Sequence, residues 1–165
     1  VGLSSGFLEP LESTSIHLIQ NSVLRLVRMF PAREIDPAEV RQFNNETTAE
    51  IENIRNFIIL HYKVTQRSDS KYWVDCREMA IPDSLAHKIA LFESNARVVR
   101  ENNEMFRERS WAAVMLGQGL EPSGYHPFVD NLDDKQLHGL MAEIRTNVGR
   151  IVDASPSQQE FLARF

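Results

Sequence analysis

The sequence has little of what several common kinds of site require, and cysteine is the clearest case. Its 165 residues contain one cysteine, Cys76, so an internal disulfide and a cysteine-based zinc cluster are both excluded. The five histidines also lack ligand spacing, because no two lie at i and i+4 on one predicted helix and no HxxE or HxH pattern occurs. We therefore predict no metal site.

Basic charge and long apolar runs are scarce as well. Asp and Glu outnumber Lys and Arg by 23 to 18, which gives a net charge of -5 and argues against a nucleic-acid partner. No apolar run approaches the ~20 residues of a membrane span, so we expect no membrane partner. No secretory signal is visible and we expect a cytoplasmic protein, although a chain that begins with Val1 gives that absence little weight.

Motifs for nucleotide binding and for nucleophilic catalysis are missing too. The sequence contains no GxGxxG, no GxxxxGK[ST] and no GxSxG. Neither a dinucleotide-binding loop nor a serine nucleophile elbow is therefore expected within these residues.

Helical periodicity dominates what is present. From Thr14 to Phe30, apolar residues recur on one helical face, and Pro31 ends the pattern. Asp36-Pro37-Ala38-Glu39 predicts a second helix start, and we expect the polar residues 44–48 to kink or break that helix. Further helices are predicted over 51–65, 72–79, 82–92, 111–116, 133–152 and 157–165. The charged stretch 97–109 is interpreted as a solvated connection.

These patterns predict a mainly α protein of about six or seven helices that forms a single helical domain over residues 1–165. Residues 1–12 do not fit it. We interpret their start, VGLSSG, as a loop or as an extended stub whose sheet lies outside this sequence, since an isolated strand is not stable.

The stretch GFLEPLESTSIHLIQ, residues 6–20, carries the one candidate site that the residues themselves suggest. Pro10 keeps this segment extended or turned, and Glu12 then stands immediately before the predicted helix. The first amides of a helix, near Thr14 and Ser15, have no internal partners and favour an anion. A plain helix cap with acids in front of it explains the same residues, and spacing leaves both interpretations open.

The same stretch, as GFLEPLEST, resembles the signature of the flavin-dependent tryptophan halogenase family. The resemblance continues through TSIHLIQNSVLRLVRMFP, NFIILHY, Tyr72-Trp73, IPDSL and SWAAVMLGQGLEPSGYHPFVD, and covers essentially the whole chain. It corresponds to the C-terminal portion of that family. The resemblance implies a missing N-terminal half that holds FAD and a catalytic lysine, with residues 1–12 at the edge of that half.

The family resemblance also implies a chemistry. Reduced FAD, supplied by a separate flavin reductase, and oxygen convert chloride or bromide into hypohalous acid, which halogenates an electron-rich aromatic substrate such as tryptophan or another indole. By motif position, Glu12 is the catalytic glutamate, the amides of Thr14 and Ser15 bind halide, and Gly6 and Phe7 lie beside the flavin. The isolated chain is then expected to be inactive and to bind no FAD tightly.

Two departures from the family pattern bear on the substrate. Several tryptophan-specific members have glycine where this chain has Ser15, although an amide is still present there. The region that holds free tryptophan in those members reads RENNEMFRERSW here, where Glu101 could meet an amine and Phe106 could stack on a ring. An indole, a phenol or a carrier-bound aromatic therefore stays open as the substrate.

Two other functions also stay open: a flavin monooxygenase relative that uses no halide, and a helical interaction module without chemistry. If a flavin half is missing, we expect exposed apolar surface where it would pack, and a homodimer could cover that surface.

Overall fold

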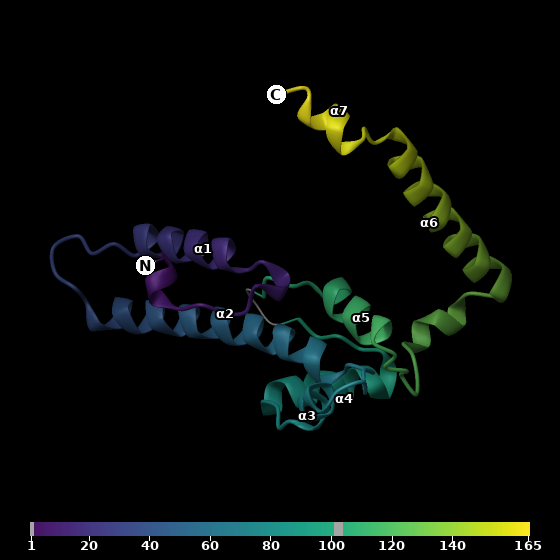
Figure 1. Ribbon diagram of the computed structural model, residues 1–165, viewed down its shortest axis with the longest axis horizontal. Helices are drawn as coiled ribbons and strands as arrows, with labels where there is room; N and C mark the ends of the chain where they lie inside the picture. The colour runs from purple at the N-terminus through teal and green to yellow at the C-terminus, as the bar shows by residue number, and fades with distance from the viewer. Residues whose placement is uncertain (1, 101–103) are drawn as a thin grey trace. The chain divides into compact units, whose positions relative to one another are not determined.

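The computed structural model describes residues 2–100 and 104–165, and every regular element in those ranges is helical (Figure 1). The mainly α prediction is therefore confirmed. The chain divides into two units, Val1–Tyr125 and His126–Phe165, which we describe separately. The single-domain organisation predicted for residues 1–165 stays a prediction.

Helix α2, Pro37–Lys63, is the longest element of the first unit. It begins where the sequence predicts, with Pro37 in its first turn and with the Asp36 carboxylate accepting a hydrogen bond from the Ala38 amide at 2.6 Å. The expected break at residues 44–48 is wrong. The helix continues through these residues, and the Thr47 hydroxyl donates to the Phe43 carbonyl at 2.8 Å, one turn back.

The hydrophobic core of this unit lies at the C-terminal half of α2. Three further helices surround it: α3 (Lys71–Glu78), α4 (Asp83–Asn95) and α5 (Glu108–Gly117). The core side chains are Phe57, Leu60, Val64, Leu85, Phe92, Trp111 and Met115. Their burial supplies most of the stabilisation of this unit, at roughly 25 cal/mol per Å² of apolar surface removed from water.

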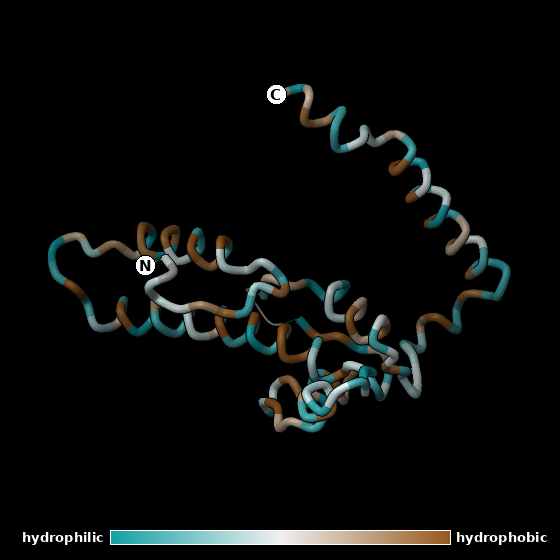
Figure 2. Tube along the Cα trace, viewed as in Figure 1, coloured by the Kyte–Doolittle hydropathy of each residue, from teal (hydrophilic) through white to brown (hydrophobic). Residues whose placement is uncertain are grey.

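Helix α1, Ser15–Arg28, lies alongside the N-terminal half of α2 and contacts it through polar side chains (Figure 1). Arg25 donates to Glu50 at 2.7 Å and to the Thr47 hydroxyl at 2.9 Å, and Asn21 donates to Glu50 at 2.5 Å. The hydrophobic residues that recur along α1 in Figure 2 are mostly exposed to solvent. They are Ile16, Val23, Leu24, Val27 and Phe30. Apolar side chains are thus exposed along this helix, and the expectation that a flavin half packs against exposed apolar surface stays a prediction.

The start of the chain differs from the extended stub that the sequence suggested. Residues Gly2–Ser5 form a 3₁₀ turn, in which the Ser5 hydroxyl donates to the Gly2 carbonyl at 2.7 Å. The physical reason is local: Gly2 has φ of +76°, which an extended strand does not use, and no strand lies in the described ranges for it to pair with. Within residues 2–12, only those from Gly6 to Glu9 lack regular structure.

The second unit consists of a 3₁₀ turn, Pro127–Asn131, and two helices, α6 (Asp134–Ala154) and α7 (Gln158–Leu162). Both helices begin near the predicted starts, each with a capping box, Asp133 with Gln136 and Ser157 with Glu160. The apolar residues predicted for one face of α6 are nevertheless largely exposed. No helix in the described part of the chain is long and apolar enough to cross a membrane.

Candidate functional site

The site begins with a tight turn ahead of α1. Residues Pro10–Glu12 form a 3₁₀ turn, which the Ser13 amide closes by donating to the Pro10 carbonyl at 2.9 Å. Ser13 itself adopts the left-handed conformation, with φ of 53° and ψ of 35°. This conformation is uncommon for serine, and it reverses the chain so that Glu12 stands directly before the helix.

Thr14 is the N-cap of α1, as predicted, but it does not cap through its side chain. Its side chain is fully buried, and Thr14 Oγ1 has no hydrogen-bond partner among the described residues. The intrahelical ladder starts only at Leu18, whose amide donates to the Thr14 carbonyl at 2.9 Å. The first amides of α1 therefore have no partner within the helix, and a helix N-terminus of this kind favours an anion.

Glu12 is held from α2. Glu12 Oε1 lies 3.0 Å from His61 Nε2, and the Glu12 side chain is 33% exposed. One carboxylate oxygen is thus engaged by a ring nitrogen, while the carboxylate as a whole still reaches solvent. His61 had no predicted role, although this residue lies in the NFIILHY stretch that carries part of the family resemblance.

Glu9 is held by the next residue along α2, Tyr62. The Tyr62 hydroxyl donates a short hydrogen bond to Glu9, and this bond raises the pKa of Tyr62 to about 12. Tyr62 also stacks against Trp73, with ring centroids 6.1 Å apart. The two acids of the LEPLE turn are therefore anchored by consecutive residues near the C-terminal end of α2.

The residues expected beside the flavin lie on the open side of this turn. Phe7 is exposed, and a Cβ atom built on Gly6 would meet no other atom within 4 Å. A large planar group could approach Gly6 closely, so these residues fit a flavin neighbour. Gly6 has φ of +155°, which other residues rarely adopt.

The residues expected to hold the substrate are Phe106 and Glu101. Phe106 stacks on Phe57 with ring centroids 3.8 Å apart, and Phe57 also packs edge-on against Trp111. One face of the Phe106 ring is therefore committed to the core. Glu101 lies outside the described residues.

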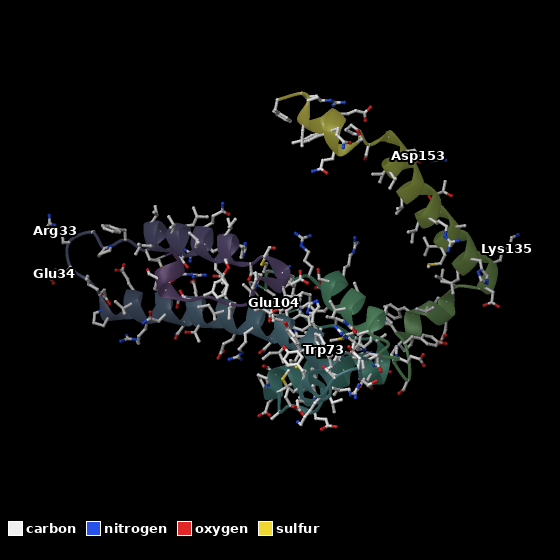
Figure 3. All side chains as sticks on the ribbon, in the orientation of Figure 1. Arg33, Glu34, Trp73, Glu104, Lys135 and Asp153 are labelled. Atoms are coloured by element: carbon white, nitrogen blue, oxygen red, sulfur yellow. The ribbon has the colours of Figure 1, made fainter. Side chains whose placement is uncertain are left out.

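The stretch 97–109 is not simply the solvated connection that its charge suggested. Glu104 is 3% exposed and lies 2.6 Å from Lys88 Nζ, which also donates to the Val99 carbonyl at 3.0 Å (Figure 3). Lys88 Nζ further lies 4.3 Å from the centroid of the Trp111 ring. The sequence signal for this burial was the spacing of Lys88, which lies three residues after Leu85 and four residues before Phe92. This spacing puts Lys88 on the buried face of α4.

A groove of about 830 Å³ lies between α1, α2 and three residues further along the chain, Arg100, Glu104 and Met105. Charged and amide side chains, including Arg25, Glu46 and Glu50, form much of its wall. Glu12, Thr14 and Ser15 do not line it. This groove is therefore separate from the expected anion site.

The tryptophan halogenase family model matches residues 1–134. A tryptophan 6-halogenase from Streptomyces toxytricini is 34% identical over 99% of this chain and 32% of its own length. A flavin-dependent halogenase structure from Xanthomonas campestris is 46% identical, with a TM-score of 0.95, and covers 100% of this chain and 33% of its own. A second, from Brevundimonas sp. BAL3, is also 46% identical, with a TM-score of 0.92, and covers 99% and 33%.

The fold agrees with these matches, and the chain belongs to the tryptophan halogenase family. It spans about a third of the length of the curated relatives that it matches.

Proposed function

We propose that this chain is the substrate-side part of a flavin-dependent halogenase acting on an electron-rich aromatic ring of the indole type. The observation that supports this most is the Glu12 turn. A carboxylate stands immediately before a helix N-terminus whose N-cap threonine is buried with its hydroxyl unpartnered. The names of the similar proteins point the same way, since they include tryptophan 6-halogenases and flavin-dependent halogenases.

In this proposal the halide binds at the amides of Thr14 and Ser15, where the positive end of the α1 dipole stabilises it. Oxygen would supply the oxidising equivalents after activation by reduced FAD, and a flavin-binding half outside this sequence would hold most of the cofactor. Gly6 and Phe7 leave room for the edge of the flavin. A separate flavin reductase would supply the reduced cofactor, in a cytoplasmic setting.

Glu12 acts on the substrate in the same scheme. When the halogen adds to a ring carbon, that carbon still carries its hydrogen and the ring is cationic. The Glu12 carboxylate takes the proton, and the electrons of the broken C–H bond restore the aromatic ring. General-base assistance of this kind contributes about 10²–10⁴-fold to a rate.

The substrate is proposed only by class. Phe106 has one ring face on Phe57, so any substrate contact would use its other face or its edge. Glu101 remains a proposed partner for an amine. Chloride and bromide both fit an amide site, and a homodimer remains a proposed arrangement for the exposed apolar faces.

Two measurements test the proposal. In a crystal soaked with bromide, anomalous density is expected at the Thr14 and Ser15 amides. In the full-length protein that carries this chain, Glu12→Gln is expected to cripple chlorination by about 10²–10⁴-fold while flavin oxidation continues. Unchanged product yield would refute the role of Glu12, and product formation without halide would favour a monooxygenase.

A further inference from the structure

His61 makes two directional contacts, one from each ring nitrogen. Its Nδ1 lies 2.8 Å from the Phe57 carbonyl oxygen, one turn back along α2. Its Nε2 lies 3.0 Å from Glu12 Oε1. The His61 side chain is only 18% exposed, so water competes poorly for either nitrogen.

These contacts fix where the ring protons lie. A carbonyl oxygen only accepts hydrogen bonds, so Nδ1 must carry a hydrogen to bond to Phe57. Without a further proton, Nε2 would then present a lone pair to a carboxylate oxygen, and the contact would be repulsive. A proton must therefore lie between His61 Nε2 and Glu12 Oε1.

The surroundings favour that proton on the histidine. Glu12 stands before the N-terminus of α1, whose positive dipole end stabilises a carboxylate. Glu9, the other nearby acid, is engaged by the Tyr62 hydroxyl, and His17, the histidine of α1, faces Glu50. The resulting imidazolium–carboxylate contact is a charge-assisted hydrogen bond, which is stronger and more directional than a neutral one.

The ring is also held by the core. It packs edge-on against Phe57, with centroids 4.9 Å apart and an interplanar angle of 89°. Phe57 is 2% exposed and belongs to the core cluster. The direction of the Nε2–H bond is therefore set by the hydrophobic core, and the bond ends on the Glu12 carboxylate of the N-terminal turn.

We infer that His61 is a positioning residue for Glu12. It holds Oε1 with a directional hydrogen bond and leaves Oε2 as the oxygen that meets the substrate. The pair itself stands on geometry alone, whereas its part in halogenation rests on the proposed function of Glu12.

Nuclear magnetic resonance of the full chain, labelled with ¹⁵N in its histidines, tests the pair without any turnover. A downfield and exchange-protected proton is expected on His61 Nε2, in its contact with Glu12. The Nδ1 proton should be present in every protonation state. Glu12→Gln should remove the protected Nε2 proton and leave Nδ1–H in place. An Nε2–H neutral tautomer, or a His61 spectrum that Glu12→Gln leaves unchanged, would overturn the inference.

Halogenation by the full-length protein tests the role. His61→Leu removes the bond to Glu12 and is expected to lower the chlorination rate about 10- to 100-fold, because a displaced catalytic group loses its orientation. His61→Gln retains an amide that can donate to Oε1 and should recover most of the loss. His87→Leu, at an exposed histidine of α4, is the matched control and should behave as the wild type.

The outcomes separate the two proposals. If Glu12→Gln cripples chlorination while His61→Leu does not, the positioning inference fails and the halogenase proposal stands. If neither variant has an effect, the proposed role of Glu12 is refuted, and the positioning role of His61 is refuted with it. If His61→Leu is impaired and His61→Gln is equally impaired while both stay folded by circular dichroism, hydrogen-bond positioning is refuted.

Discussion

Helices α2 and α6 have comparable amphipathic patterns, but only α2 buries its apolar face. α2 buries Ile54, Phe57, Ile58 and Leu60, because α4 and α5 supply apolar faces that pack against it. α6 contains no buried residue within its unit, although Leu140, Ile144, Val148 and Ile151 recur at helical spacing. The same sequence signal thus predicts a helix in both places, but only the presence of a partner decides whether its apolar face is buried.

The largest expected difference between the two regions is in stability. Trp111→Ala should destabilise the first unit by about 3–5 kcal/mol, because it leaves a cavity among fully buried side chains. Ile144→Ala, on the exposed face of α6, should cost less than about 0.5 kcal/mol. Urea denaturation of the chain, followed by tryptophan fluorescence and circular dichroism, measures both. Equal losses would show that the α6 face is covered in solution.

Loss of the buried Lys88 charge should lower the free energy of unfolding nearly as much as loss of the Trp111 side chain. Lys88→Ala should cost about 3 kcal/mol, since it leaves the Glu104 carboxylate buried without its ammonium partner. Lys71→Ala breaks an exposed ion pair with Asp75 of the same 2.6 Å length and should change the free energy of unfolding little. Thermal melts of the two variants compare buried and exposed pairs directly. A loss for Lys88→Ala as small as that for Lys71→Ala would contradict burial of the pair.

The helix N-termini offer a finer comparison. Asp36→Ala removes the side-chain cap of α2 and should cost about 1 kcal/mol. Thr14→Val keeps the shape of the buried side chain and breaks no hydrogen bond within the described residues, so the free energy of unfolding should stay within about 0.5 kcal/mol. Denaturant titrations test both. A large loss for Thr14→Val would mean that its hydroxyl already has a partner in solution.

The smallest effect concerns the anchor of Glu9. The hydrogen bond to Glu9 raises the pKa of Tyr62 from 10.0 to about 12. Because the folded-state pKa is raised, the stabilisation is fully present below pH 10 and is lost as the pH rises towards 12. Absorbance at the tyrosinate band should therefore show a tyrosine that ionises near pH 12, and Glu9→Gln should bring its midpoint back towards 10.0. A midpoint unaffected by Glu9→Gln would contradict the contact.

Much of the local structure could be predicted from the sequence. The starts of α2, α6 and α7 follow from Asp36-Pro37, Asp133 and Ser157, because capping depends on neighbouring residues. The prediction failed at residues 44–48, where contacts with Arg25 of α1 and a local Thr47 bond keep the helix intact. It failed also for the charged stretch 97–109, where burial of Glu104 depends on Lys88 of another helix.

The candidate site likewise has one part that the sequence predicts and another part that it does not. The sequence by itself determined that Glu12 precedes a helix N-terminus, since Pro10 and the periodicity from Thr14 onward are local features. Only the tertiary structure decided that Glu12 meets His61 and Glu9 meets Tyr62, which are 49 and 53 residues away along the chain. The physical reason is that capping and periodicity act within one or two helical turns, whereas hydrogen bonds between distant segments depend on how the core brings those segments together.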